Sequence, residues 1–310
     1  MNGRRRVLLD TDLAMGAPGS DIDDGFALAL AIADPGIELE LVTTVGGNTD
    51  VDTATALSRQ LLERLGRPDI PVVRGSGGPL SGGGGRGTAV PRPRAHAAVD
   101  IAERVLAEPG ELTLVAIGPL TNVALALLLA PDVAGSLREI VIMGGGYLRH
   151  TNIAAMVGEF NVWCDPEAAS VVFGSGAPLR CVGMDVTTRV RLTDADAARM
   201  AAGGRPFGAF AGAATREWIA HWDRTNPGAT DQHGSCALHD PLAVAAVTHP
   251  ELLTWRPAHV TVETQGRHTR GITVADLLTL ENPTPANCEI ATDVDVDGFR
   301  ELFVSRVADL

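Results

Sequence analysis

The sequence contains no lysine, and all 25 residues counted as lysine or arginine are arginine. This absence excludes the P-loop phosphate site and Schiff-base catalysis, because both require a lysine amine. Aromatic residues are also scarce, at 4% of the chain, and Tyr147 is the sole tyrosine. A clamp built from several tyrosines is therefore excluded, so any stacking on a ligand must use tryptophan or phenylalanine.

Cysteines are few and apolar runs are short. The four cysteines are widely spaced and form no CxxC pair, which predicts reduced thiols in a cytoplasmic protein rather than a disulfide framework. After the basic residues 4–6, only three apolar residues precede Asp10, so we expect no export signal. No segment offers the ~18 uninterrupted apolar residues of a membrane helix, so we expect no membrane span.

Positive charge is in deficit, with a formal net charge of -13 at pH 7. Nucleic acid and anionic membranes both bind basic surfaces, so we expect neither as a partner. A small neutral or cationic ligand fits this charge better. With 310 residues, 45% of them hydrophobic, the chain can bury a large core, and we predict one domain over residues 1–310.

Short β-branched runs alternate with amphipathic stretches along the first 182 residues. This rhythm predicts an α/β fold with a doubly wound, mostly parallel open sheet. The predicted strands are 7–9, 39–45, 72–73, 112–117, 140–143 and 179–182, and the predicted helices are 24–33, 52–65, 95–107, 121–129 and 166–173. Ligands bind beyond the carboxyl ends of such strands, so the residues that follow each strand are candidates for a site.

The strand rhythm stops between about residues 189 and 235, where a polar, helix-prone region contains Phe210, Trp218 and Trp222. We interpret this region as a helical cap over the pocket. An ordinary surface insertion that packs its aromatic side chains inward is an equal alternative.

Five aspartates crowd one predicted strand-to-helix turn, at positions 10, 12, 21, 23 and 24. Two carboxylates ~4 Å apart repel each other by about 4 kcal/mol at an effective dielectric constant near 20, so such a cluster binds protons or a cation. The cluster contains oxygen ligands without cysteine or histidine, which favours Ca²⁺ or Mg²⁺ over zinc. Helix capping explains one or two of these aspartates, but not the whole group.

Other candidate groups follow later strands, and each has a structural alternative. Thr121 opens a predicted helix, either as a cap or with its carbonyl turned toward the ion, and Asn48 fits a turn residue as well as a ligand. Asp165 and Pro166 are typical of a helix start, which leaves Glu159 and Asn161 on the preceding loop.

The last pair of candidates opens an apolar helix late in the chain. Asp240 is either a helix cap or a metal ligand, or both. The adjacent His239 is an ordinary structural histidine or a titratable acid beside the metal.

Taken together, these motifs resemble the inosine-uridine-preferring nucleoside hydrolase family. They occur in order along nearly the whole chain: Asp10-Thr11-Asp12 with Asp23-Asp24, Thr43 to Asn48, Gly118 to Asn122, Met143 to Gly146, Glu159-Phe160-Asn161 with Asp165 to Ala169, and His239-Asp240-Pro241. Each motif is weak alone, but the ordered set is specific.

The resemblance implies a Ca²⁺-dependent enzyme that hydrolyses the N-glycosidic bond of ribonucleosides to ribose and free base. By position, the metal ligands fall on Asp12, Asp24, Asp240 and the carbonyl of Thr121. Asp12 also becomes the general base, which takes a proton from a metal-bound water before an oxocarbenium-like transition state. His239 contacts the base and protonates it as it leaves. The ribose-side groups fall on Asp23, Asn48, Asn152, Met143, Glu159 and Asn161.

Besides its scarcity of tyrosine, the sequence departs from the family pattern in two places. The usual short Asp-Pro-Gly-x-Asp-Asp turn is lengthened, with residues 13–22 between Asp12 and Asp23, which leaves the metal geometry and the roles of Asp10 and Asp21 open. Asn152 matches the family's asparagine only with a shift of one residue. The family also suggests a homodimer or homotetramer with a small nucleoside as substrate.

Two other functions compete with this interpretation. A non-catalytic Ca²⁺-dependent nucleoside- or ribose-binding protein would keep the pocket without turnover. The Asp10-x-Asp12 pair after a strand also resembles Mg²⁺-dependent phosphatases of the haloacid-dehalogenase type. Those enzymes need a later lysine or an equivalent cation, and this chain has no lysine.

Overall fold

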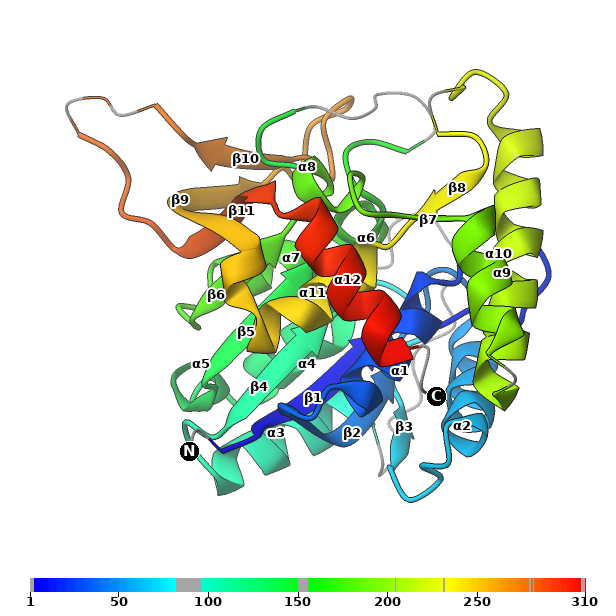
Figure 1. Ribbon diagram of the computed structural model, residues 1–310. Coiled ribbons are helices and arrows are strands. Elements are labelled where there is room, and N and C mark those ends of the chain that lie inside the picture. The colour runs from blue at the N-terminus through cyan, green and yellow to red at the C-terminus, as the bar shows by residue number, and fades with distance from the viewer. Residues whose placement is uncertain are drawn as a thin grey trace.

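A nine-stranded sheet forms the centre of the molecule, in the strand order β10-β9-β11-β6-β5-β4-β1-β2-β3 (Figure 1). The computed structural model describes residues 3–81, 96–149, 156–203, 205–230, 232–278, 280, 282–307 and 310. The strands of this sheet are β1 (Arg5–Thr11), β2 (Ile37–Thr44), β3 (Val72–Arg74), β4 (Leu112–Ala116), β5 (Glu139–Met143), β6 (Leu179–Val182), β9 (Leu253–Val262), β10 (Thr273–Asp276) and β11 (Cys288–Val294).

The sheet is mostly parallel, as the alternating sequence pattern predicts. Strands β1 to β6 pair in parallel, and β11 joins β6 in the same sense. In this sheet only β9 runs against the other strands, and it pairs antiparallel with both β11 and the edge strand β10. From the central β1 the chain continues to β2 and β3 on one side and later to β4, β5 and β6 on the other. The order therefore reverses beside β1, which is where open α/β sheets bind their ligands.

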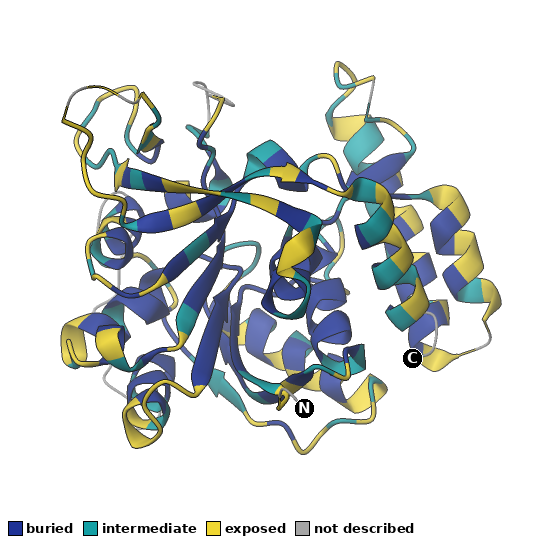
Figure 2. Ribbon diagram, turned by 60° about the vertical axis from the view of Figure 1, so that its left-hand side comes forward, coloured by how far each residue is buried: buried dark blue, intermediate teal, exposed yellow. Residues whose placement is uncertain are grey.

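Helices cover both faces of the sheet, so the fold is doubly wound. One apolar core contains residues of α1 (Asp23–Ala33), α11 (His239–Thr248) and α12 (Val296–Val307). The other contains residues of α3 (Ala97–Ala107), α4 (Thr121–Leu129) and α7 (Pro166–Phe173). Figure 2 shows the strands buried between these layers, with exposed residues on the outer helix faces. The inner strands are apolar along almost their whole length because both of their faces are covered.

The remaining elements are short, except for the helices α2 and α10. They are α2 (Val51–Arg64), α5 (Val133–Ser136), α6 (Phe160–Cys164), α8 (Met184–Thr187), η1 (Pro250–Leu252), a hairpin of β7 (Arg191–Thr193) and β8 (Ser235–Ala237), and the packed pair α9 (Asp194–Ala202) and α10 (Pro206–Thr225). In α1, Phe26 packs edge-on against Phe207 of α10 and Phe303 of α12. The ring centroids lie 6.3 Å and 5.4 Å apart, respectively. These contacts fix α10 to the body of the fold.

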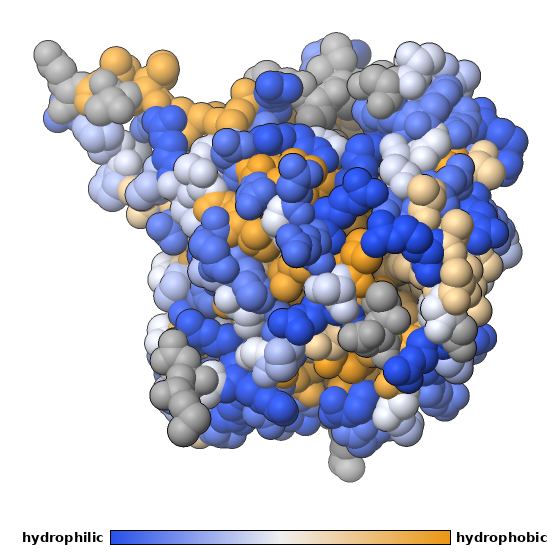
Figure 3. All heavy atoms as spheres, viewed as in Figure 1, coloured by the Kyte–Doolittle hydropathy of each residue, from blue (hydrophilic) through white to orange (hydrophobic). Residues whose placement is uncertain are grey.

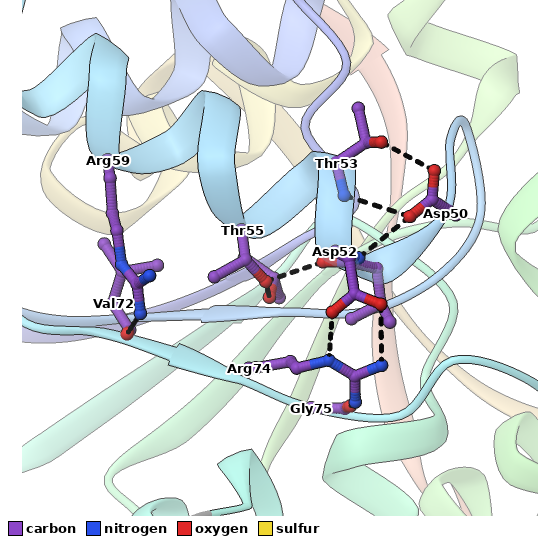
Figure 4. Close-up of polar contacts among 10 residues, drawn as sticks. Asp50, Asp52, Thr53, Thr55, Arg59, Val72, Arg74 and Gly75 are labelled. Atoms are coloured by element: carbon purple, nitrogen blue, oxygen red, sulfur yellow. Dashed lines mark hydrogen bonds and ion pairs between the residues drawn. The ribbon is translucent and has the colours of Figure 1, made fainter.

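The loop between β2 and α2 is held by polar contacts at the start of α2 (Figure 4). Asp50 caps the helix by accepting hydrogen bonds from the backbone N–H groups of Asp52 at 3.1 Å and Thr53 at 3.0 Å. The Asp52 carboxylate then pairs with Arg74 on β3. This arrangement fixes the end of the loop that carries Asn48.

An apolar arm extends from one edge of the sheet. The segment after β10 projects from the sheet edge and exposes apolar side chains, with Leu278 71% and Leu280 70% exposed. Figure 3 shows apolar atoms gathered on this arm, at the upper left. Within the described residues, no helix combines the length and apolar character that crossing a bilayer requires.

Candidate active site

The first strand delivers two aspartates to the point where the sheet order reverses. Asp10 and Asp12, at and just beyond the end of β1, are completely buried. Because Asp10 pairs in register with Thr43 of β2, its Oδ1 accepts a hydrogen bond from the Thr43 hydroxyl, and a second from Asn122 Nδ2 at 2.8 Å. Burial raises the pKa of Asp10 to about 7. Asp10 is thus part of a buried polar network beneath the site.

Asp12 lies where two glycine loops pass close to its carboxylate. A Cβ atom on Gly47 would lie 2.1 Å from Asp12 Oδ2, and one on Gly118 would lie 2.9 Å from Asp12 Oδ1. The backbone N–H of Asn48 donates to Oδ2 at 2.6 Å. Across the part of the chain that the structure describes, no hydrogen-bond donor reaches the buried Oδ1. One oxygen of Asp12 is therefore oriented by the protein and the other is free for a ligand.

Asp23 and Asp24 lie in the first turn of α1, but neither caps that helix. Its N-cap residue is Ile22, which makes no side-chain cap hydrogen bond. Asp24 Oδ1 accepts from the Thr11 hydroxyl, and its Oδ2 accepts from Asn48 Nδ2 at 3.0 Å. Asp23 Oδ2 accepts from the backbone N–H of Asp240 at 3.2 Å. The capping alternative for these two aspartates therefore fails.

Three carboxylates meet closely enough to share one cation. Asp23, Asp24 and Asp240 each offer a ligand atom, and these atoms lie within 4.8 Å of one another. Asp240 reaches this position from the first turn of α11, where its side chain caps nothing, since the N-cap residue is Leu238. Asp12 lies outside this group of three, although its charge contributes to raising the pKa of Asp240.

The cluster is electrostatically unfavourable without a cation. Burial is the first cause of every raised pKa here, and repulsion between the carboxylates adds to it for Asp23. The pKa of Asp23 rises to about 7 and that of Asp24 to about 6, while those of Asp12 and Asp240 rise well above their usual range. The unpartnered Asp12 Oδ1 and the all-oxygen donor set fit a hard divalent cation.

The Thr121 side chain faces a structural partner. Its hydroxyl donates to Asp165 Oδ2 at 2.7 Å, and Leu120, rather than Thr121, occupies the N-cap position of α4. Asp165 Oδ1 in turn accepts from the backbone N–H of Ala168, so Asp165 caps α7 with Pro166 at N1, as the sequence predicts. The predicted role of the Thr121 carbonyl as a metal ligand rests on the family resemblance.

A cavity of about 530 Å³ opens beside the carboxylates and collects most of the predicted substrate-side residues. Asp23, Asn48, Met143, Glu159, Asn161, His239 and Asp240 all line it. Asn152 lies outside the described residues. The cavity is large enough for a nucleoside-sized ligand.

The ribose-side candidates are held rigidly by the backbone around them. Asn161 Nδ2 donates to the carbonyls of Ile117 at 2.8 Å and Met143 at 3.2 Å, at the ends of β4 and β5. The Glu159 carboxylate accepts three backbone N–H bonds, from Gly145, Asn161 and Val162. These bonds favour the charged carboxylate, although burial raises the pKa of Glu159.

His239 is anchored through one ring nitrogen. Its Nδ1 lies 2.7 Å from the hydroxyl of Thr187 on α8, which leaves Nε2 for a ligand in the cavity. Burial lowers the pKa of His239, and the nearby Asp21 opposes that effect. Sequence reasoning did not single out Thr187. The signal that could have found it is its place shortly after the end of β6, where residues of such sheets reach the site.

Several cavity residues escaped the sequence reasoning, and others were only suspected. Trp218 and Trp222 of α10 line the cavity, so the region between 189 and 235 contributes to the site. The lengthened turn also contributes Gly19, Ser20 and Asp21. Met156, Phe160 and Met184 add apolar surface, and no motif singled out the two methionines.

Comparisons with known proteins show what the chain is similar to. Residues 7–301 match the model of the family described as inosine-uridine preferring nucleoside hydrolase. The pyrimidine-specific ribonucleoside hydrolase RihA of Enterobacter sp. (strain 638) is 38% identical over 319 residues, covering 97% of both chains. A probable uridine nucleosidase 1 of Oryza sativa subsp. japonica is 36% identical over 280 residues, covering 85% of this chain and 82% of the relative.

Solved structures show the same fold. A purine-preferring ribonucleoside hydrolase from Gardnerella vaginalis superposes with a TM-score of 0.86 at 29% identity, covering 98% of both chains. A plant nucleoside hydrolase gives the same TM-score and identity, covering 99% of both chains.

Proposed function

Because this chain belongs to the inosine-uridine preferring nucleoside hydrolase family and is a nucleoside hydrolase, we propose that it uses Ca²⁺ to hydrolyse the N-glycosidic bond of ribonucleosides. The products are ribose and a free base. The observation that carries this proposal is the buried carboxylate cluster of Asp23, Asp24 and Asp240 beside a nucleoside-sized cavity.

The metal ligands in this proposal are Asp12, Asp24, Asp240 and the Thr121 carbonyl. Asp23 supplies a further oxygen close to Asp24 and Asp240 and contacts the ribose. When bound, Ca²⁺ would supply positive charge that lowers the pKa of a water molecule and attracts sugar hydroxyls. A ribonucleoside is favoured over a deoxyribonucleoside because its 2′-hydroxyl is one of those oxygen groups.

Asp12 acts as the general base. Asn48 orients its carboxylate, which accepts the proton of the attacking water as the bond to C1′ of the sugar forms. Positive charge develops on the ribose ring because the bond from C1′ to the base breaks, with its electron pair going to the base, ahead of the new bond to the water oxygen. The fixed carboxylates, among them Glu159 with its three backbone donors, stabilise that charge without reorganising.

The base departs on the side of His239, Trp218 and Trp222. Thr187 fixes the imidazole ring, and Nε2 donates a proton to the departing base. The two indole rings offer apolar faces on which a planar base stacks. Tryptophan takes this role because the chain has only one tyrosine, and the hydroxyl of that residue, Tyr147, donates to the carbonyl of Gly144.

We further propose one domain over residues 1–310, with 189–235 as a cap within it, in a cytoplasmic homodimer or homotetramer. All four cysteines are free, which suits a reducing compartment. The apolar arm with Leu278 and Leu280 offers surface for a second copy. Light scattering of the purified protein measures the number of copies.

The test is to incubate the protein with inosine or uridine and to measure reducing sugar, with and without a chelator. Ribose release that stops on chelation and returns with Ca²⁺ supports the proposal. Tight nucleoside binding without ribose release would indicate a binding protein instead. Phosphate release from phosphoesters would indicate a phosphatase.

A further inference from the structure

The lengthened turn of residues 13–22 begins inside the hydrophobic core. Leu13 and Ala14 are completely buried, and Met15 is 2% exposed. Met15 lies under the start of α1 so closely that a Cβ atom on Gly25 would meet its sulfur at 2.3 Å. The first part of the turn is therefore a packed element rather than a free surface loop.

The rest of the turn lies against α10. A Cβ atom on Gly16 would lie 3.6 Å from both Phe210 of α10 and Leu57 of α2. Further along, a Cβ atom on Gly19 would lie 3.1 Å from the ring of His221. Both glycines have positive φ, at +106° and +69°, so other residues would be strained there. The turn thus contacts α10 at two places along the helix, near Phe210 and near His221.

The second of these contacts continues to the cavity. The His221 ring stacks on Trp218, with ring centroids 5.5 Å apart and planes 12° apart. Turn residues and Trp218 also line a small cavity of about 70 Å³ between the turn and α10. Trp218 also lines the large cavity, and the turn contributes Ser20 and Asp21 to the wall of that same cavity.

We propose that the lengthened turn supports the base-binding wall of the site. His221 is the positioning residue, because it contacts the turn on one side and the Trp218 indole on the other. This inference rests on the proposed function, because it assigns Trp218 to the base of a nucleoside. The turn fixes the position of His221, and His221 fixes the plane of the indole. The base then stacks on a surface that is already ordered.

The physical reason is preorganisation. A side chain that is immobile before binding loses less conformational entropy when a ligand stacks on it. The ribose-side groups Asn161 and Glu159 are held by other backbone contacts, at the ends of β4 and β5 and around α6. The turn should therefore affect recognition of the base and leave recognition of ribose unchanged.

The experiment compares His221→Ala with the control Arg216→Ala, an exposed residue of the same helix that lines neither cavity. We expect His221→Ala to raise KM for inosine or uridine about 3- to 10-fold, the size of one aromatic stacking contact, with little change in kcat. The inhibition constant of free ribose should stay constant, while that of free base rises. His221→Phe keeps a stacking ring and should restore KM.

A second variant perturbs the same contact from the turn. Gly19→Ala places a methyl group against the His221 ring and should raise KM in the same direction. Thermal melting of every variant checks that it folds. If the unmodified chain cleaves nucleosides and His221→Ala has the KM of Arg216→Ala, the inference is wrong. If the unmodified chain releases no ribose from any nucleoside, the proposed function fails first.

Discussion

Removing the metal should make the stability of this protein fall as pH rises. Two carboxylates 4.8 Å apart, the upper limit for the ligand atoms of Asp23, Asp24 and Asp240, repel each other by about 3.5 kcal/mol at an effective dielectric constant near 20. The metal-free protein avoids this repulsion by holding protons. Burial, with repulsion between carboxylates added to it, raises the pKa of Asp23 to about 7 and that of Asp24 to about 6.

The sign of the effect follows from the protons bound in each state. In the unfolded chain these carboxyl groups titrate near pH 3.9, so between about pH 4 and 7 the folded metal-free protein holds more protons than the unfolded one. The free energy of unfolding therefore falls as pH rises through this window. Asp23 alone, shifted by roughly three units, removes on the order of 4 kcal/mol by pH 7.

Calcium should reverse this loss. At a free concentration 1,000 times its dissociation constant, a ligand of the folded state adds about 4 kcal/mol to the free energy of unfolding, which corresponds to roughly 6 °C in Tm for a protein of 310 residues. Binding also needs ionised carboxylates, so the difference in Tm between the calcium-loaded and chelated proteins should widen from pH 5 to pH 8.

Thermal melting in calcium or in chelator, at several pH values, measures the gap. The reasoning fails if calcium leaves Tm unchanged at every pH, or if the gap narrows as pH rises. Asp50→Asn serves as a control, because that exposed carboxylate lies outside the cluster and only caps α2.

Three further predictions concern single side chains. Asp12→Asn should lower kcat about 10²- to 10⁴-fold, the range for loss of a general base, while circular dichroism shows an intact fold; turnover at the wild-type rate would remove Asp12 from the mechanism. His239→Ala should slow nucleosides much more than an aryl riboside, whose leaving group needs no proton, and equal slowing of both in steady-state assays would contradict its role as acid. Asn122→Ala should lower the free energy of unfolding by about 2–4 kcal/mol, measured in urea, because Asn122 bonds to Asp10, Thr44 and Ser76 in a buried network. An unchanged urea midpoint would show that this network contributes little to stability.

The parallel part of the fold was predictable because its signal is local. Buried strands such as Leu112–Ala116 are short apolar runs, and the helix Pro166–Phe173 has an aspartate cap and a proline at N1, so its bounds were predicted correctly. The antiparallel edge of β9 and β10 was missed. Leu253–Val262 mixes exposed and buried positions and contains Pro257, which weakens the strand pattern.

The candidate site was predictable as a list of residues and less so as an arrangement. Strand ends pointed to Asp12, Asn48 and Met143, because parallel strands present their carboxyl ends along one edge. The contact of Asp23 with Asp240 joins residues 217 positions apart, and no local pattern encodes it. The stack of His221 on Trp218 was equally hidden, because it depends on where the lengthened turn packs.

The distance along the chain between these contacts has a consequence for biosynthesis. Asp10 bonds to Asn122, 112 residues away. Asp23 cannot accept its hydrogen bond from Asp240 until that residue has left the ribosome. Contacts of such high sequence separation require long loops to close, which slows folding. A chain truncated before α11 would lack Asp240, so its carboxylate cluster would be incomplete however much of its sheet had formed.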